Sequence, residues 1–376
     1  MIEKYKRVNS SFGNNPNFLA LFFISIILSF ALQSSVSLSV GVVVLALFVV
    51  INNSFRYIEF ICLMLIFFIC LPPIFSLHHG LSPLLYFILF SLSLIASRCV
   101  SQYDIAVIKD SLSRTYIVYA FCSLLAYIVN IDSPEPFEGL IPGTSTNGIT
   151  SYLIVLQVSY SIIFYLQKGY FPVLSAFCTL FIAIIGIGRG SIYSAFLIVS
   201  FTLLFNFLLH IKNNRIEALI VFVVFSLSFV ALLLINYDSI YDYMGSSTKA
   251  LQGVNDSARI NILTEYLGNL NGINLFTGQS FDRSLIGDKY DGNPHISYLR
   301  THAYMGLFVI LLMLSPLLVV FFKVDFLSKS FILFFILISL FRAVSEPILF
   351  PTLLDIFYLI PFFYLTKEHD SRTVNT

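Results

Sequence analysis

Histidine and arginine side chains stand out in a chain that is otherwise strongly apolar. His295 lies in the stretch GNPHISYL, and His302 follows seven residues later. Arg189 lies between two glycines in GIGRGS, and Arg259 lies in DSARI. A neutral histidine can take a proton from a hydroxyl group as a general base. Guanidinium groups bind phosphate oxygens through paired hydrogen bonds. These residue types therefore favour chemistry on a phosphate-linked substrate.

The residues around His295 predict the start of a helix. Asn293 favours the N-cap position and Pro294 the first helical position, which would place His295 in the first turn. The positive end of the helix dipole disfavours a further positive charge there, so we expect a neutral imidazole. His302 would lie two turns further along the same face. The alternative for both histidines is a structural hydrogen bond, and we prefer that alternative for His302.

Arg189 is expected in a tight turn between two apolar segments. Its predicted place on the outer side of a membrane opposes the usual excess of positive charge inside. Gly188 and Gly190 allow the backbone to approach a ligand closely. A bound phosphate would account for both features. The alternative is an arginine that extends to the membrane surface without a ligand.

Arg259 is expected in the first turn of an amphipathic helix on the outer membrane surface. Apolar residues recur at helical spacing there, at Ile260, Leu263, Leu267 and Leu270. A cation near a helix N-terminus is slightly unfavourable, whereas a bound anion would interact with the arginine and with free backbone N–H groups. The alternative is a solvated surface arginine.

Further charged residues are secondary candidates, together with His302. Arg342 lies four residues before Glu346, so an ion pair along one helix is its simplest role. Asp355 is predicted inside a membrane span, where a carboxylate is by default a functional candidate. A buried partner for Arg342 is an equally good interpretation of Asp355. Arg283 lies in the same polar loop as Arg259.

The composition indicates an all-α, polytopic membrane protein. Of 376 residues, 58% are hydrophobic and only 11% are charged, whereas soluble domains average about 25% charged residues. At about 20 residues for each transmembrane helix, the chain has room for about ten to thirteen spans. The net charge of +1 and the lack of a basic face give no indication of nucleic acid binding.

No disulfide framework, metal site or cofactor is predicted. The five cysteines lie in or beside apolar runs, as small apolar side chains do. His78 and His79 are adjacent, so they do not easily face one ion, and no Asp-x-Asp pair occurs.

Apolar runs separated by polar breaks predict about twelve spans in a single membrane domain over residues 1–376. The first span is expected to stay as an uncleaved helix. The spans are expected near residues 17–33, 36–51, 58–75, 81–97, 115–130, 148–166, 171–188, 191–209, 216–235, 299–321, 330–346 and 349–365.

The distribution of lysine and arginine predicts that both termini are cytoplasmic. With this orientation, all but seven of the 21 basic residues fall on the inner side. The longest inner loop, predicted at residues 98–114, is too short for a nucleotide-binding domain. The one large extramembrane segment, residues 236–298 between spans nine and ten, then faces outward and contains short helices. We therefore expect the chemistry on the outer face.

Four short motifs in this order resemble the bacterial O-antigen polymerases (Wzy), within the O-antigen ligase/polymerase superfamily. The architecture covers the whole chain, and the motifs cover about a tenth of it. Ile296 stands where that family often has asparagine after the histidine, so no amide is expected there. The motifs are GIGRGS at 186–191, DSARI at 256–260, FTGQSF with Gly278, and GNPHISYL at 292–299 followed by Gly306.

The resemblance implies a metal-independent glycosyltransferase of the GT-C type in the bacterial inner membrane. Such an enzyme joins undecaprenyl-pyrophosphate-linked oligosaccharides at the periplasmic face, with inversion of the anomeric centre. His295 would match the residue that deprotonates the acceptor hydroxyl, and Arg189 and Arg259 would match arginines that hold the pyrophosphate. Membrane lipid and a chain-length regulator protein are the expected partners, and no nucleotide is required.

Two other activities remain open at this point. The related O-antigen ligase has the same predicted chemistry. A lipid-linked oligosaccharide flippase, which belongs to a different class, would also suit twelve spans. Its polar residues are expected along a central cavity, however, whereas here they gather in one outer loop.

Overall fold

The computed structural model describes most of the chain outside the N-terminal tail and the segment before Ser257. The described residues are 15–32, 34–52, 57–76, 79–133, 135–137, 146–212, 257–282, 284–290, 292–324 and 326–373.

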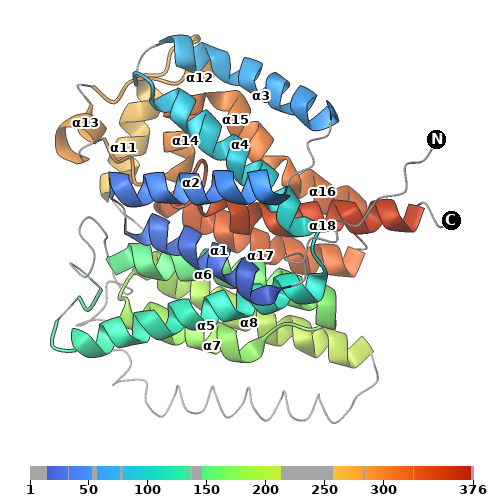
Figure 1. Cartoon of the computed structure of the whole chain (residues 1–376). Helices are drawn as coiled ribbons and strands as arrows, with labels where there is room; N and C mark the ends of the chain where they lie inside the picture. The colour runs from blue at the N-terminus through green and yellow to red at the C-terminus, as the bar shows by residue number, and fades with distance from the viewer. Residues whose placement is uncertain are drawn as a thin grey trace.

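The described residues form helices joined by short connections (Figure 1). Eight helices precede the segment that is not described, and the others follow it. The first group is α1 (Pro16–Ala31), α2 (Ser35–Asn52), α3 (Tyr57–Ser76), α4 (Ser82–Ser101), α5 (Ile105–Val129), α6 (Thr146–Lys168), α7 (Val173–Ile185) and α8 (Arg189–Lys212). The second group is α11 (Ser257–Gly268), α12 (Asn274–Thr277), α13 (Leu285–Tyr290), α14 (Ser297–Met305), α15 (Leu307–Leu314), α16 (Pro316–Lys323), α17 (Phe326–Ser345) and α18 (Asp355–Thr373).

Six of these helices are long and apolar enough to cross a membrane, which indicates a multi-pass membrane protein. They are α2, α4, α5, α6, α8 and α17, and shorter apolar helices lie beside them. Large apolar side chains point outward from the bundle. For example, Val36 in α2 is 72% exposed and Leu174 in α7 is 85% exposed. Exposed apolar surface on this scale is expected where helices face lipid rather than water.

Helix α6 lies at the centre of the bundle and packs against α1, α5, α7, α8, α17 and α18. Its side chains are almost all buried, including the polar residues Gln157 and Ser161. Gln157 Nε2 donates to Ser161 Oγ at 2.9 Å and to Ser175 Oγ at 3.0 Å, which offsets part of the cost of burying the amide. The core therefore depends on apolar packing with a few polar contacts between helices.

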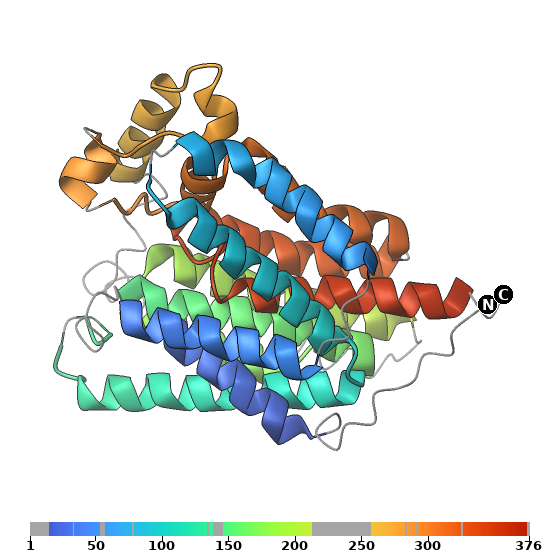
Figure 2. The same ribbon diagram turned by 45° about the horizontal axis from the view of Figure 1, so that its top comes forward.

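The short helices α11, α12 and α13 gather at one end of the bundle (Figures 1 and 2). Helix α18 runs away from them toward the opposite end. These short helices have a small apolar core of their own. That core consists of Ile262, Tyr266, Phe281, Ile286, Ile296, Leu299 and Ala303. The predicted polar loop is thus a packed layer over one end of the bundle, at least from Ser257 onward.

The first eight predicted spans correspond to α1–α8. The predicted loop at residues 98–114 is wrong, because α4 continues to Ser101 and α5 begins at Ile105. Asp104 separates the two helices as an N-cap, with its side chain accepting from Ala106 N at 2.8 Å. The ninth predicted span, residues 216–235, lies outside the described residues.

The predicted span at 299–321 is also wrong as a single helix. It is divided into α14, α15 and α16. Gly306 separates α14 from α15. It has a φ of 76°, and its backbone lies against the carbonyl oxygen of Phe276. A side chain would not fit there. Pro316 begins α16 after Ser315, as expected for a residue that favours the first turn.

The predicted last span, 349–365, begins too early. Residues 346–354 form an irregular segment, and α18 begins only at Asp355. The segment is buried, so each of its backbone polar groups needs a partner inside the protein. Those partners come from the region of the candidate site.

Candidate functional site

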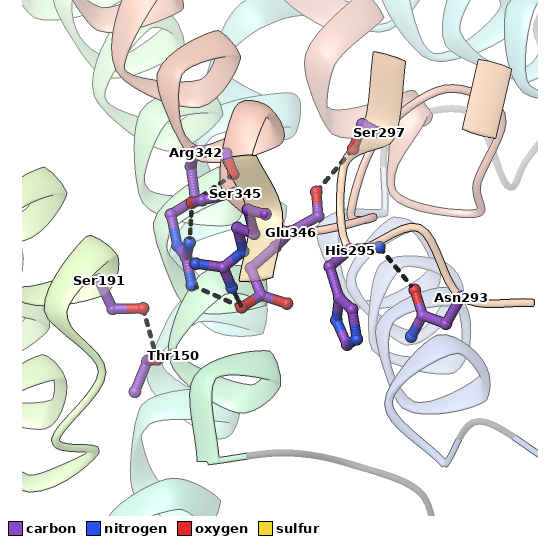
Figure 3. A network of polar contacts seen from close by, with 9 residues as sticks. Thr150, Ser191, Asn293, His295, Ser297, Arg342, Ser345 and Glu346 are labelled. Carbon is purple, nitrogen blue, oxygen red and sulfur yellow. Dashed lines mark hydrogen bonds and ion pairs between the residues drawn. The ribbon is translucent and has the colours of Figure 1, made fainter. Parts of the chain in front are cut away.

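Two arginines that are distant in sequence share one buried carboxylate. Arg342 Nη2 lies 3.5 Å from Glu346 Oε1, and Arg259 Nη2 lies 3.3 Å from the same oxygen. Arg342 lies in the last turn of α17 and Glu346 directly follows that helix, whereas Arg259 lies in the first turn of α11. The predicted ion pair between Arg342 and Glu346 is confirmed (Figure 3). One negative charge faces two positive charges, so this pair of arginines retains an excess of positive charge.

Arg342 is almost completely enclosed, with a side chain that is only 1% exposed. Its Nη1 donates to Ser345 Oγ. Within the described part of the chain, its Nε and Nη2 atoms make no hydrogen bond, and Nη2 has only the ion pair to Glu346. A buried guanidinium with unused donors is costly unless another acceptor completes its contacts. This arrangement favours the binding of an anionic group.

The N-terminus of α8 lies against the guanidinium group of Arg342. A Cβ atom placed on Gly190 would lie 2.8 Å from Arg342 Nη1 and 3.3 Å from Ser345 Oγ. Only glycine allows this approach. Arg189 is the first residue of α8 and directly precedes Gly190. The first N–H groups of a helix lack partners within the helix and favour an anion.

A tight turn before α8 sets this position. Ile187 has a positive φ of 62°, and Gly188 N donates to Gly186 O at 2.7 Å. Thr150 in α6 donates to Ser191 Oγ at 2.7 Å and ties the start of α8 to the central helix (Figure 3). The two glycines that the sequence indicated thus have separate roles, one in the turn and one against Arg342.

Ser297 connects the histidine stretch to the arginines. Its Oγ donates to the carbonyl oxygen of Glu346 at 2.7 Å and accepts from Leu349 N at 3.1 Å. Since His295 lies two residues before Ser297, the chain brings it to the edge of the same cluster (Figure 3). Sequence reasoning missed Ser297. A serine at the first position of a helix gave no signal of a contact with a distant loop.

His295 occupies a turn and not a helix, so the predicted helix start at Asn293 and Pro294 is wrong. Helix α14 begins at Ser297, and His295 has a left-handed φ of 53°. Its backbone N–H donates to Asn293 Oδ1 at 3.0 Å, as in an Asx turn. The aromatic ring of Tyr290 faces the imidazole edge-on, with 5.4 Å between the ring centroids. The half-buried imidazole is positioned by this turn, and the helix dipole argument no longer applies.

His302 has the structural role that we preferred from the sequence. It is buried, and its Nε2 lies 2.8 Å from the carbonyl oxygen of Leu275. A carbonyl only accepts, so Nε2 carries the proton and the neutral ring accepts at Nδ1 from Tyr266 Oη, 2.8 Å away. Burial raises the pKa of Tyr266 above its ordinary value, so the phenol stays protonated and can donate. Because His295 is not helical, the two histidines do not share a helix face.

Asp355 stabilises the irregular segment and does not pair with Arg342. Its two carboxylate oxygens accept from Phe350 N and from Thr352 N, both at 2.8 Å. Arg300 supports the same segment, because its Nη2 donates to Leu349 O at 3.2 Å. The predicted pairing of Asp355 with Arg342 is therefore replaced by backbone capping. Arg283 lies outside the described residues.

The predicted site residues thus fall into two groups. Arg259 and Arg342 converge on Glu346, with His295 at the edge of this cluster, and Arg189 directly precedes Gly190, which packs against Arg342. His302 and Asp355 hold the protein backbone in place. No protein-family model matches the sequence, and no curated protein or solved structure is significantly similar to it.

Proposed function

We propose that this protein is a glycosyltransferase of the O-antigen polymerase (Wzy) type that joins undecaprenyl-pyrophosphate-linked oligosaccharide repeat units. The observation that carries the proposal is the buried Arg342, which shares Glu346 with Arg259 and has unused donors beside the N-terminus of α8. A pyrophosphate group offers several anionic oxygens to such a cluster.

In this proposal the arginines stabilise the leaving group. The bond between the anomeric carbon of the donor sugar and the pyrophosphate oxygen breaks, and lipid pyrophosphate departs with the electron pair. Negative charge on the departing oxygen increases in the transition state, and preorganised donors in a site that excludes water stabilise it most strongly there. Arg342 and Arg259 supply those donors, together with Arg189 from the start of α8.

His295 is the proposed general base. The hydroxyl of the acceptor sugar forms the new bond to the anomeric carbon and transfers its proton to the imidazole. Attack from the side opposite the leaving group inverts the anomeric centre. The half-buried position of His295 at the edge of the arginine cluster supports this division of roles. No metal or nucleotide enters the reaction.

The finer topology is part of the same proposal. About twelve spans of the GT-C type would cross the bacterial inner membrane, with both termini in the cytoplasm and residues 236–298 in the periplasm. The exposed apolar side chains of Ile260, Leu263 and Leu267 on α11 support a position of that helix at the membrane surface. The lipid part of the substrate would then stay in the bilayer while its pyrophosphate reaches the arginines.

Deletion of the gene in its own bacterium tests the activity, with lipopolysaccharide separated on a gel. A polymerase defect leaves the core with a single repeat unit. Bare core with polymer still on the lipid carrier would indicate a ligase instead. Bare core without periplasmic polymer would indicate a flippase, and an unchanged ladder would contradict the proposal when no second enzyme is encoded.

Complementation with His295→Asn tests the role of the histidine. Asparagine tolerates the left-handed backbone of residue 295 but cannot act as a base, so the turn should be kept while the chemistry is lost. We expect polymer formation to fall by about 100-fold or more, within the range for general base catalysis. Membrane levels of the variant should match wild type. A normal ladder would remove His295 from the mechanism.

A further inference from the structure

A second polar site lies in the layer of short helices, apart from the arginine cluster. It is a cavity of about 250 Å³ between α11, the connection after α12, and α13. Its polar wall includes the side chains of Glu265, Asn269, Asn274, Gln279 and Asp282. Apolar side chains of the small core, including Ile262 and Ile286, form the other part.

The chemistry of this wall suits an uncharged polyol. The described residues that line the cavity include two carboxylates and three amides, which are groups that bind hydroxyls. A metal ion is disfavoured, because among the described residues no three His, Cys, Asp or Glu side chains are placed to hold one. Amide and carboxylate groups beside an apolar surface match the hydroxyl groups and the C–H face of a sugar ring.

Some polar side chains of the cavity wall make hydrogen bonds within the protein, whereas others can bond to a ligand. Both oxygens of Glu265 accept from Leu285 N, at 3.2 and 3.1 Å, and so cap the start of α13. Gln279 Nε2 donates to the carbonyl of Tyr266 at 2.9 Å. Within the described part of the chain, the side chains of Asn269, Asn274 and Asp282 make no hydrogen bond or ion pair. Glu265 and Gln279 therefore fix the shape of the cavity, and the other three side chains can contact a ligand.

Helix α13 connects the cavity to the histidine. Ile286, near the start of this helix, lines the cavity, and Tyr290 at its end faces the imidazole of His295. The two positions are about 6 Å apart along the helix axis, at about 1.5 Å per residue. An oligosaccharide of a few sugar units spans the distance from the cavity to the base.

We propose that this cavity binds one sugar residue of the acceptor oligosaccharide and so positions the acceptor hydroxyl at His295. The inference rests on the proposed glycosyltransferase function and adds the subsite that holds the acceptor. The donor pyrophosphate would bind to the arginines, and the acceptor glycan would bind to the amide and carboxylate groups of the cavity wall.

Binding of a lipid-free oligosaccharide to the full-length protein in lipid nanodiscs tests this proposal. The probe is the repeat-unit oligosaccharide released by mild acid from the deletion strain and labelled with a fluorophore at its reducing end. The test variant is the double substitution Asn269→Ala with Asp282→Asn. The matched control is Asn261→Ala with Asp288→Asn, which changes exposed residues of α11 and α13 outside the cavity wall.

We expect about tenfold weaker binding for the cavity variant and unchanged binding for the control, because Asn269→Ala removes an amide group and Asp282→Asn removes a charged acceptor. His295→Asn should bind the probe like wild type while making no polymer. Equal affinity of the cavity variant and wild type would overturn the proposal, and so would the absence of binding to wild type. A full ladder in the deletion strain together with cavity-dependent binding would contradict the polymerase proposal and leave the glycan site in place.

Discussion

The arginine cluster and the loop cavity lie near each other but are built in opposite ways. In the cluster, Arg259 at the start of α11 and Arg342 near the end of α17 share Glu346, close to the start of α8, and Arg342 is only 1% exposed. The cavity is formed by short helices, and its available residues Asn269 and Asp282 are exposed. One site concentrates buried positive charge, and the other presents neutral and acidic groups.

The difference shows how each site is held in place. Burying a charge costs free energy, so the arginines depend on Glu346, Ser345 and the close packing of Gly190. The available cavity residues Asn269 and Asp282 are exposed and need only a rigid frame, which the small apolar core and the cap on α13 provide. Substitutions in the cluster should therefore affect activity strongly, whereas substitutions around the cavity should have milder effects.

The largest effect is expected for Arg342→Met. Methionine fills a similar apolar volume but removes the guanidinium group from the proposed pyrophosphate site. Loss of one preorganised donor group lowers rates by about 100- to 1000-fold, so polymer should be almost absent from the lipopolysaccharide gel. Binding of the labelled oligosaccharide should be unchanged. Arg114→Met, on an exposed arginine of α5, is the matched control. A ladder like that of the control would show that Arg342 is structural only.

A smaller effect is expected for Gly190→Ala. The added methyl group would lie 2.8 Å from Arg342 Nη1, so the guanidinium must move away from its present position. We expect polymer formation to fall by about tenfold, with weaker inhibition by inorganic pyrophosphate, because guanidinium hydrogen bonds depend on geometry. The control is Gly268→Ala, where the added atom meets open space. Equal activity of the two variants would refute a close fit between α8 and Arg342.

The smallest effect on activity is expected for Tyr266→Phe, a residue that lines the cavity but whose hydroxyl bonds to His302. This variant leaves the buried Nδ1 of His302 without its donor, which costs about 1–3 kcal/mol of folding stability. Activity at moderate temperature should be kept. Thermal unfolding in detergent measures the change, with Tyr170→Phe on an exposed tyrosine as the control. Lost activity at unchanged stability would assign Tyr266 a direct role in binding.

Helix content and the first eight apolar segments were predictable because continuous apolar runs leave the backbone no alternative in a membrane. The internal breaks were harder to predict. Gly306 and the segment at 346–354 are apolar in sequence, so they look like parts of spans. The helix is interrupted at Gly306 because the backbone carbonyl of Phe276 lies against it. The segment at 346–354 is irregular because Ser297, Arg300 and Asp355 form hydrogen bonds with its backbone.

The residue types of the site were determined by the sequence alone, since Arg189, Arg259 and His295 stand out against an apolar background. Their assembly was decided only by the tertiary structure. Sequence spacing placed Arg342 beside Glu346 by helical periodicity, but no local pattern places Arg259 on the same carboxylate, 87 residues away. Local propensity likewise predicted a helix at Asn293, where the fold holds His295 in a turn. Contacts between distant segments, such as that between Ser297 and Glu346, have no signature in local sequence.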